Sequence, residues 1–120
     1  MKAFAEARRL CPGQNLQLML VGSHYETTAS IKALAWDLGL QGCLHLPGQV
    51  ADITGLLRAT DLVVNSYLTA GCPNGVLEPM ALGLPVLGTD ISGLRQALGE
   101  SMAARSLSPA HDWQRLGWLI

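Results

Sequence analysis

The sequence lacks the patterns by which several protein classes are usually identified. Its three cysteines are widely spaced and form no C-x-x-C pair, so neither a zinc ribbon nor a disulfide framework is indicated. No apolar run approaches the roughly 18 residues of a membrane-spanning helix. The dinucleotide fingerprint G-x-G-x-x-G and the P-loop motif are also missing. These absences leave a globular protein whose functional site uses none of these motifs.

Charge is scarce and evenly divided. The 120 residues carry 8 Lys and Arg against 9 Asp and Glu, a net charge of −1, with no basic stripe, so we expect no nucleic-acid partner. With 49% hydrophobic and 14% charged residues the chain is not of the disordered type. The start, MKAFAEARRL, lacks the apolar core of a signal peptide. We therefore expect a cytoplasmic protein.

Metal and thiol chemistry are not indicated either. We interpret Cys11, Cys43 and Cys72 as reduced thiols of a cytosolic protein. The three histidines His24, His45 and His111 are scattered, and a metal site would need them to meet in the folded chain. We expect no metal ion and no cofactor.

Short apolar runs and helical patterns alternate along the whole chain, separated by a few turn residues. Strands are expected over residues 16–21, 43–46, 61–65, 85–88 and 103–107, and helices over 4–10, 28–38, 53–57, 74–82, 92–98 and from 109 onward. The alternation predicts an α/β fold, a Rossmann-like parallel β-sheet of about five or six strands with helices on both faces. No linker divides it, so residues 1–120 are expected to form a single domain.

In such sheets, ligands bind beyond the carboxyl ends of the strands. The longest loop at that edge, residues 66–74, contains Gly71, Pro73 and Asn74 and leads directly into a helix. The free N–H groups and the dipole of that helix start favour an anion. Asn74 either caps the helix or leaves its amide for a ligand.

Glu78 is the one carboxylate of the apolar stretch 71–89. It lies off the expected buried stripe of Val76, Leu77, Met80, Ala81 and Leu84, on the flank of Asn74. One interpretation is structural, because the helix dipole stabilises a carboxylate near an N-terminus by up to about 1 kcal/mol. The other is functional, since a carboxylate can accept a pair of hydrogen bonds from the diol of a ribose. Pro79 removes one intrahelical bond and is expected to distort the first turn.

Three segments together resemble a known family. LQLMLVG, LHLPGQVADITGLLRATDLVVNS and CPNGVLEPMALGLPVLGTDISG are similar to the C-terminal, donor-binding half of nucleotide-sugar glycosyltransferases with the GT-B fold, especially glycosyltransferase family four (group 1). The likeness covers most of the chain. Each fragment is weak alone, but the set is specific.

The resemblance implies a nucleoside diphosphate sugar as ligand and assigns roles to residues. Glu78 matches the second glutamate of the family's Glu-seven-residues-Glu motif, which holds the donor ribose. The diphosphate and sugar would meet the backbone of Gly71, Cys72, Pro73, Asn74, Gly75, Val76 and Leu77. The nucleobase pocket would be lined by Gly22, Gly48, Gln49 and Val50.

The sequence departs from the family pattern in three respects. Ala70 stands where the motif has its first glutamate. The basic residues that neutralise the diphosphate lie upstream of the first helix in the family, and so does the acceptor-binding domain. We therefore expect a domain truncated at its N-terminal side, the donor half of a retaining glycosyltransferase that is incomplete as an isolated chain.

Two alternatives stay open at this point. One is a non-catalytic truncated module that acts in binding or self-association, and the other is one fragment of a split glycosyltransferase. The apolar end of the chain favours either a homodimer or an acceptor-domain partner, because one helical face cannot bury all of its large side chains. These are Trp113, Leu116, Trp118, Leu119 and Ile120.

Overall fold

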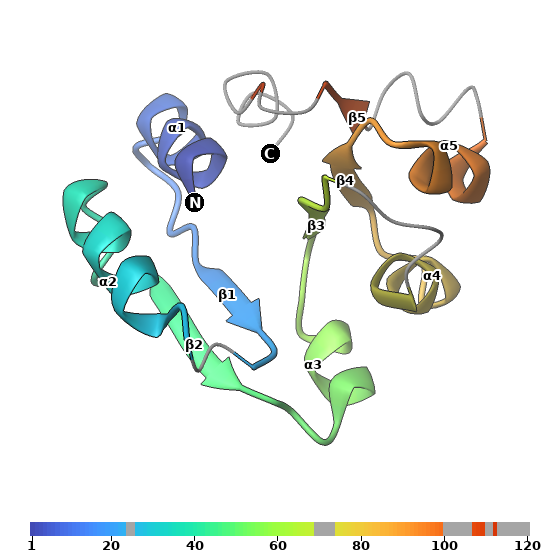
Figure 1. The fold of residues 1–120 in the computed structure, drawn as a ribbon, viewed down its shortest axis with the longest axis horizontal. Helices are drawn as coiled ribbons and strands as arrows, with labels where there is room; N and C mark the ends of the chain where they lie inside the picture. Colours follow the sequence, from blue (N-terminus) through green and yellow to red (C-terminus); the bar gives the residue numbers. More distant parts are fainter. Residues whose placement is uncertain (24–25, 69–73, 100–106, 110–111, 113–120) are drawn as a thin grey trace.

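The computed structural model describes residues 1–23, 26–68, 74–99, 107–109 and 112, in which helices and strands alternate (Figure 1). The helices are α1 (Lys2–Leu10), α2 (Thr28–Asp37), α3 (Ile53–Arg58), α4 (Asn74–Ala81) and α5 (Ser92–Leu98). The strands are β1 (Leu18–Val21), β2 (Leu44–Gly48), β3 (Val63–Asn65), β4 (Val86–Thr89) and β5 (Leu107–Ser108). The expected α/β class is confirmed.

The strands form parallel sheets, but in two parts. β1 pairs with β2, and a second sheet has the order β3-β4-β5. Across the molecule, β1 and β3 are the inner strands of the two sheets (Figure 1). A continuous sheet was expected from the sequence. Within the described residues no ladder joins β1 to β3, so the sheet is interrupted at this point.

Helix α1 packs against both sheets. Phe4 belongs to the core of the β1–β2 part, with Ala35, Leu40 and Cys43, whereas Ala3 packs with Leu87 of β4. Both α1 residues are buried. Burial of the α-amino group of Met1 lowers its pKa below the ordinary value. The helix thus connects the two sheets through apolar contacts on neighbouring residues.

The second sheet has its own core. Val76 of α4 and Leu94 of α5 are fully buried and pack with Val86 and Leu107 of β4 and β5. All four residues of β4 are buried, as expected for a central strand of a parallel sheet. By contrast, β1 is not buried throughout. Its residues instead alternate, and Met19 and Val21 are 44% and 40% exposed.

Close packing around Gly88 fixes the position of α5. A Cβ atom at this residue would lie 2.6 Å from Cδ2 of Leu94 and 2.8 Å from the carbonyl oxygen of Asn65. β4 therefore approaches both α5 and β3 at a residue without a side chain. This packing holds the carboxyl ends of β3 and β4 together, where the site is expected.

Several helix boundaries can be compared with the sequence. Asp52 caps α3, and its Oδ1 accepts a hydrogen bond of 2.8 Å from the N–H of Gly55. α5 begins at Ser92, so that residue lies inside the helix and Ile91 is at the cap position. The expected strand over 103–106 and the helix after 109 lie outside the described residues, as do Cys72 and the apolar residues from Trp113 onward. The homodimer therefore stays a prediction.

No helix in the described ranges is long and apolar enough to cross a bilayer. Cys11 is exposed and Cys43 buried, and both are free thiols.

Candidate functional site

Glu78 lies on an exposed flank of α4 and lines a hollow of about 320 Å³ between α4 and α3. The other lining residues are Ile53, Thr54 and Leu57 of α3, with Ala81 and Leu82. The hollow is largely apolar, and the Glu78 carboxylate and the Thr54 hydroxyl give it hydrogen-bonding groups. A carboxylate beside an open apolar surface can hold a polyhydroxylated ligand.

The buried stripe of α4 differs from the expected one. Val76 and Pro79 are its buried residues, with Met80 partly buried. Leu77 was expected in this stripe but is 44% exposed, and Ala81 is exposed as well. Pro79 and Met80 follow Val76 by three and four residues and therefore share its helix face. Pro79, and not Leu77, thus belongs to the buried stripe. Glu78 lies off the stripe, as the sequence indicated.

Two glycines proposed for the nucleobase pocket meet at the edge of the first sheet. Gly22 follows β1 and Gly48 ends β2, and the N–H of Gly22 donates to the carbonyl of Gly48 at 2.8 Å. Both have positive φ, +125° and +76°, a conformation that side-chain-bearing residues rarely adopt. Each allows the chain to turn sharply at the end of its strand.

From Gly48 the chain leads directly to the hollow. Gln49 is exposed and Val50 half-buried, and Asp52 then caps α3, whose first turn lines the hollow beside Glu78. The segment 48–50, expected to hold the base, thus leads into the first turn of α3. That turn lines the same hollow as Glu78, the residue expected to hold the ribose.

The carboxyl ends of β3 and β4 are joined by a cluster that the sequence analysis missed. Thr89 is buried, and its Oγ1 donates to the carbonyl oxygen of Tyr67, with a longer contact of 3.4 Å to the carbonyl of Asn65. The Oδ1 of Asn65, also buried, accepts from the N–H of Tyr67 at 3.2 Å. These bonds fix the start of the loop that leads toward α4. In the sequence, Asn65 and Thr89 are marked only as the polar residues that end two short apolar runs.

An ion pair follows β4 at the same edge. The Nε of Arg95 donates to Oδ1 of Asp90 at 2.6 Å, and its terminal nitrogen contacts the second carboxylate oxygen. The main-chain N–H of Asp90 donates to the carbonyl of Ser108 at 2.7 Å. The Asp90 carboxylate is thereby held by α5 and its backbone by β5.

Part of the expected diphosphate segment can be placed. Gly71, Cys72 and Pro73 lie outside the described residues. Asn74 is the first helical residue of α4 and is exposed, with Gly75 exposed beside it. The side chain of Val76 is fully buried in the core of the second sheet.

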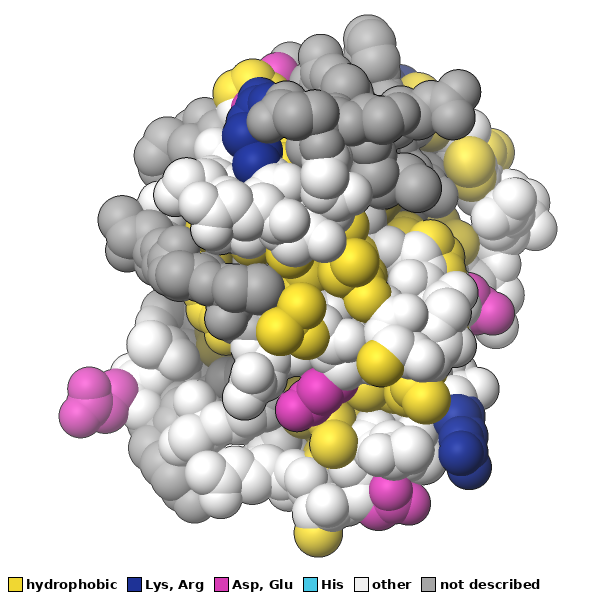
Figure 2. Space-filling view, turned by 90° about the vertical axis from the view of Figure 1, so that its right-hand side faces the viewer, with side chains coloured by type: hydrophobic (Ala, Val, Ile, Leu, Met, Phe, Trp, Pro, Cys, Tyr) yellow, Lys and Arg dark blue, Asp and Glu magenta, His cyan; other side chains and the backbone are white. Residues whose placement is uncertain are grey.

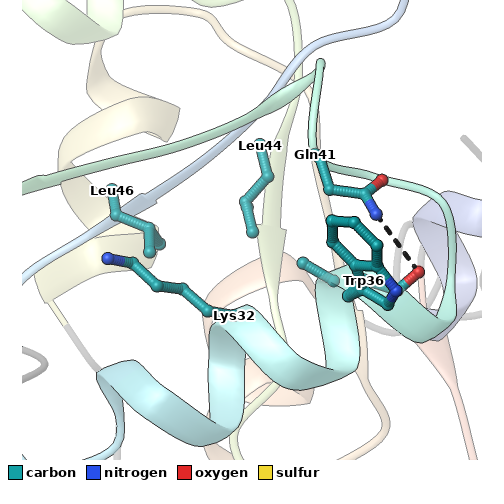
Figure 3. Close-up of a pocket in the computed structure, with 6 residues that line it drawn as sticks. Lys32, Trp36, Gln41, Leu44 and Leu46 are labelled. Carbon is teal, nitrogen blue, oxygen red and sulfur yellow. Dashed lines mark hydrogen bonds between the residues drawn. The ribbon is translucent and has the colours of Figure 1, made fainter.

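A second hollow of about 400 Å³ lies between α2 and β2 (Figure 3). It is lined by Lys32, Ala35, Trp36, Gln41, Leu44 and Leu46. Among these residues, the side-chain amide of Gln41 donates to the carbonyl of Trp36 at 3.4 Å. None of the site residues expected from the sequence lines this hollow.

The face formed by α3, α4 and α5 has hydrophobic side chains over its middle, with acidic and basic groups mainly around them (Figure 2). Leu77 on α4 and Leu82 directly after it are 44% and 39% exposed. An apolar surface of this kind next to Glu78 suits a ligand or a protein surface better than it suits water.

The comparisons with known proteins agree with this geometry. The model of the family described as glycosyl transferases group 1 matches residues 1–117. Similar solved structures include three of Anabaena Alr3699/HepE: in complex with UDP (24% identity, TM-score 0.81), with UDP and glucose (25%, 0.80) and with UDP-glucose (26%, 0.78). Each alignment covers 98% of this chain and 33% of the solved chain, so the chain spans about a third of that length.

No curated protein sequence matches the chain. The family match, in contrast, extends over nearly all of it, and the solved structures share its arrangement of helices and strands. The chain therefore belongs to the group 1 glycosyl transferases.

Proposed function

We propose that this chain binds a nucleoside diphosphate sugar and forms the donor half of a retaining glycosyl transfer. The observation that carries the proposal is the position of Glu78, exposed on α4 and facing a hollow shared with the first turn of α3. Its carboxylate accepts hydrogen bonds from the two hydroxyls of the donor ribose.

The base occupies the neighbouring edge of the first sheet. There Gly22 and Gly48 are bonded to each other, and their tight turns expose the backbone on which a planar base can lie. Gln49 is exposed and provides an amide, and Val50 an apolar contact. HepE, at 25–26% identity, was solved with UDP-glucose and with UDP and glucose, which supports a uridine nucleotide for this chain as well.

The diphosphate and the sugar lie against the backbone of residues 71–77. The described part of this segment, Asn74 to Leu77, is the first turn of α4, whose N–H groups and dipole stabilise negative charge. In the transfer step these groups stabilise the departing diphosphate. Asn65 and Thr89 act indirectly, by fixing the strand ends from which the segment departs.

Transfer also requires an acceptor held next to the donor sugar. The chain spans a third of the solved relatives, and we infer that the acceptor site comes from additional protein, either in the same polypeptide or in a partner. In this proposal residues 1–120 form a single donor-binding domain.

Calorimetric titration of the purified chain with UDP, UDP-glucose, GDP and ADP tests the proposal. We expect saturable binding of UDP and UDP-glucose, and weaker binding of the two purine nucleotides. Absence of heat from all four ligands at millimolar concentration would contradict it.

A further inference from the structure

The hollow of about 400 Å³ between α2 and β2 has no part in the proposed nucleotide site (Figure 3). Its apolar lining consists of the buried Ala35 with the half-buried Leu44 and Leu46. The two leucines are two residues apart on β2, so both point from the same face of the strand. Small-molecule sites are typically mostly apolar, contain a few polar groups that orient the ligand, and measure roughly 300–1,000 Å³. The hollow has the size and the lining of such a site.

Trp36 forms one end of the hollow, beside Gln41 (Figure 3). Its side chain is 72% exposed, the largest fraction among the large hydrophobic side chains that the structure describes. A tryptophan buries roughly 150–250 Å² when it is covered, and aromatic rings stack favourably on its faces. Trp36 therefore presents a broad, flat apolar surface at the rim of an apolar hollow.

Lys32 forms the opposite end. It precedes Trp36 by four residues, so both side chains lie on one face of α2. In Figure 3 its side chain extends so that the ammonium group lies beside Leu46, with Leu44 between it and Trp36. Lys32 is the one charged residue that lines the hollow, and neither ion pair of the described residues involves it. No carboxylate lies three or four residues from it on α2. The ammonium group is thus available to an anion.

We propose that this hollow is a second ligand site, which binds a small organic anion with a flat, apolar body. The anionic group pairs with Nζ of Lys32, and the flat body lies against the indole of Trp36 and over Leu44. A neutral hydrocarbon would leave the ammonium group unpaired. A sugar would place its hydroxyls against the leucines without hydrogen-bond partners. An aromatic or similarly flat acid complements both ends of the hollow.

Binding of naphthoate to the full 120-residue chain, followed by NMR of isotope-labelled protein, tests this inference. Naphthylmethanol and naphthylmethylamine are the neutral and cationic counterparts. We expect saturable shifts of the Trp36 indole N–H and of the Leu44 and Leu46 amides. Because an exposed ion pair contributes modestly, naphthoate should bind about threefold tighter than the alcohol and about tenfold tighter than the amine. Added salt should reduce this preference.

Two variants separate the charge from the ring. Lys32→Met keeps an apolar stem and removes the ammonium group, so naphthoate and the alcohol should bind it equally. Trp36→Ala removes the flat surface and should weaken all three probes by about fivefold or more. Both residues are exposed, so both variants should fold. The matched control is Lys2→Met, at the other lysine of the chain, which is exposed on α1 and should bind naphthoate as the wild type does.

Three results would overturn the proposal. The first is that no probe shifts the Trp36 signals at millimolar concentration, and the second is that naphthoate and the amine bind equally well. The third is that the Trp36 signals shift with protein concentration in the absence of any probe, which would assign this surface to a second copy of the chain. Glu78→Gln should bind naphthoate as the wild type does, so none of these results bears on the proposed nucleotide site.

Discussion

Buried polar residues at strand ends carry more of the site than the sequence suggested. Asn65 and Thr89 each end a short apolar strand, and both are buried and hydrogen-bonded across β3 and β4. Their side chains tie down Tyr67 at the start of the loop toward α4. A sequence pattern shows that a strand ends at such a residue, but not whether its side chain turns to solvent or to the neighbouring strand.

Thr89→Val tests this cluster. Valine keeps the shape of threonine but cannot donate to the carbonyl of Tyr67, which then loses that donor. We expect a loss of about 1–2 kcal/mol in the free energy of unfolding, measured by urea denaturation. Thr89→Ser keeps the hydroxyl and should lose less. A loss in Thr89→Ser with none in Thr89→Val would show that the methyl contact matters and the hydrogen bond does not.

The close approach at Gly88 gives a second prediction. Its Cβ position lies 2.6 Å from Leu94 and 2.8 Å from the Asn65 carbonyl, so Gly88→Ala should destabilise the fold by about 1–3 kcal/mol. At Gly75 an added Cβ would meet no atom within 4 Å, and Gly75→Ala should be neutral or stabilise α4 by up to about 1 kcal/mol. Thermal unfolding of both variants provides the comparison. A harmless Gly88→Ala would show that α5 can move away from β4.

At the scale of elements, the sequence predicted the strands and helices well where turn residues bound a short apolar run. The start of β1 shifted by two residues, and the buried stripe of α4 changed because Pro79, and not Leu77, faces the core. The roles of Gly22 and Gly48 were assigned from resemblance alone. Their mutual hydrogen bond depends on sheet register, which no local pattern reveals.

The short helix α3 offers a prediction at this scale. Six residues give little intrinsic stability, so its Asp52 cap is expected to matter. Asp52→Ala should reduce the free energy of unfolding by about 1 kcal/mol and weaken UDP binding, because the first turn of α3 lines the hollow beside Glu78. Asp61→Ala, at an exposed residue before β3, should change stability by less than about 0.5 kcal/mol. Similar losses of unfolding free energy in both variants would show that removing any negative charge destabilises the protein, and that the Asp52 cap has no special role.

At the scale of the whole molecule, the split sheet was not predictable. Each strand could be recognised by its own residues, but which strands pair is decided by contacts between distant segments. The sequence therefore suggested one sheet, whereas the described strands form two sheets connected by α1. Met19 and Val21 on β1 and Val64 on β3, the inner strands of the two sheets, are 44%, 40% and 37% exposed.

The length of the chain relative to its solved relatives leads to a prediction about activity. With about a third of their length, the isolated chain is predicted to bind a donor without transferring the sugar, because we place the acceptor site in additional protein. Incubation with UDP-glucose and a panel of acceptors should release no UDP above the blank. Release well above the blank, abolished by Glu78→Ala, would show that the chain is catalytically sufficient.

The most direct test of the central claim is the affinity of UDP for the wild-type chain and for Glu78→Gln. Glutamine keeps the size of the side chain but removes the charge, and losing hydrogen bonds to a charged acceptor costs about 1.5–3 kcal/mol. Titration calorimetry should therefore show at least about tenfold weaker binding for this variant. The control Asp37→Asn, at the exposed end of α2, should bind as the wild type does. Equal affinity of Glu78→Gln and wild type would contradict the assignment of Glu78 to the ribose.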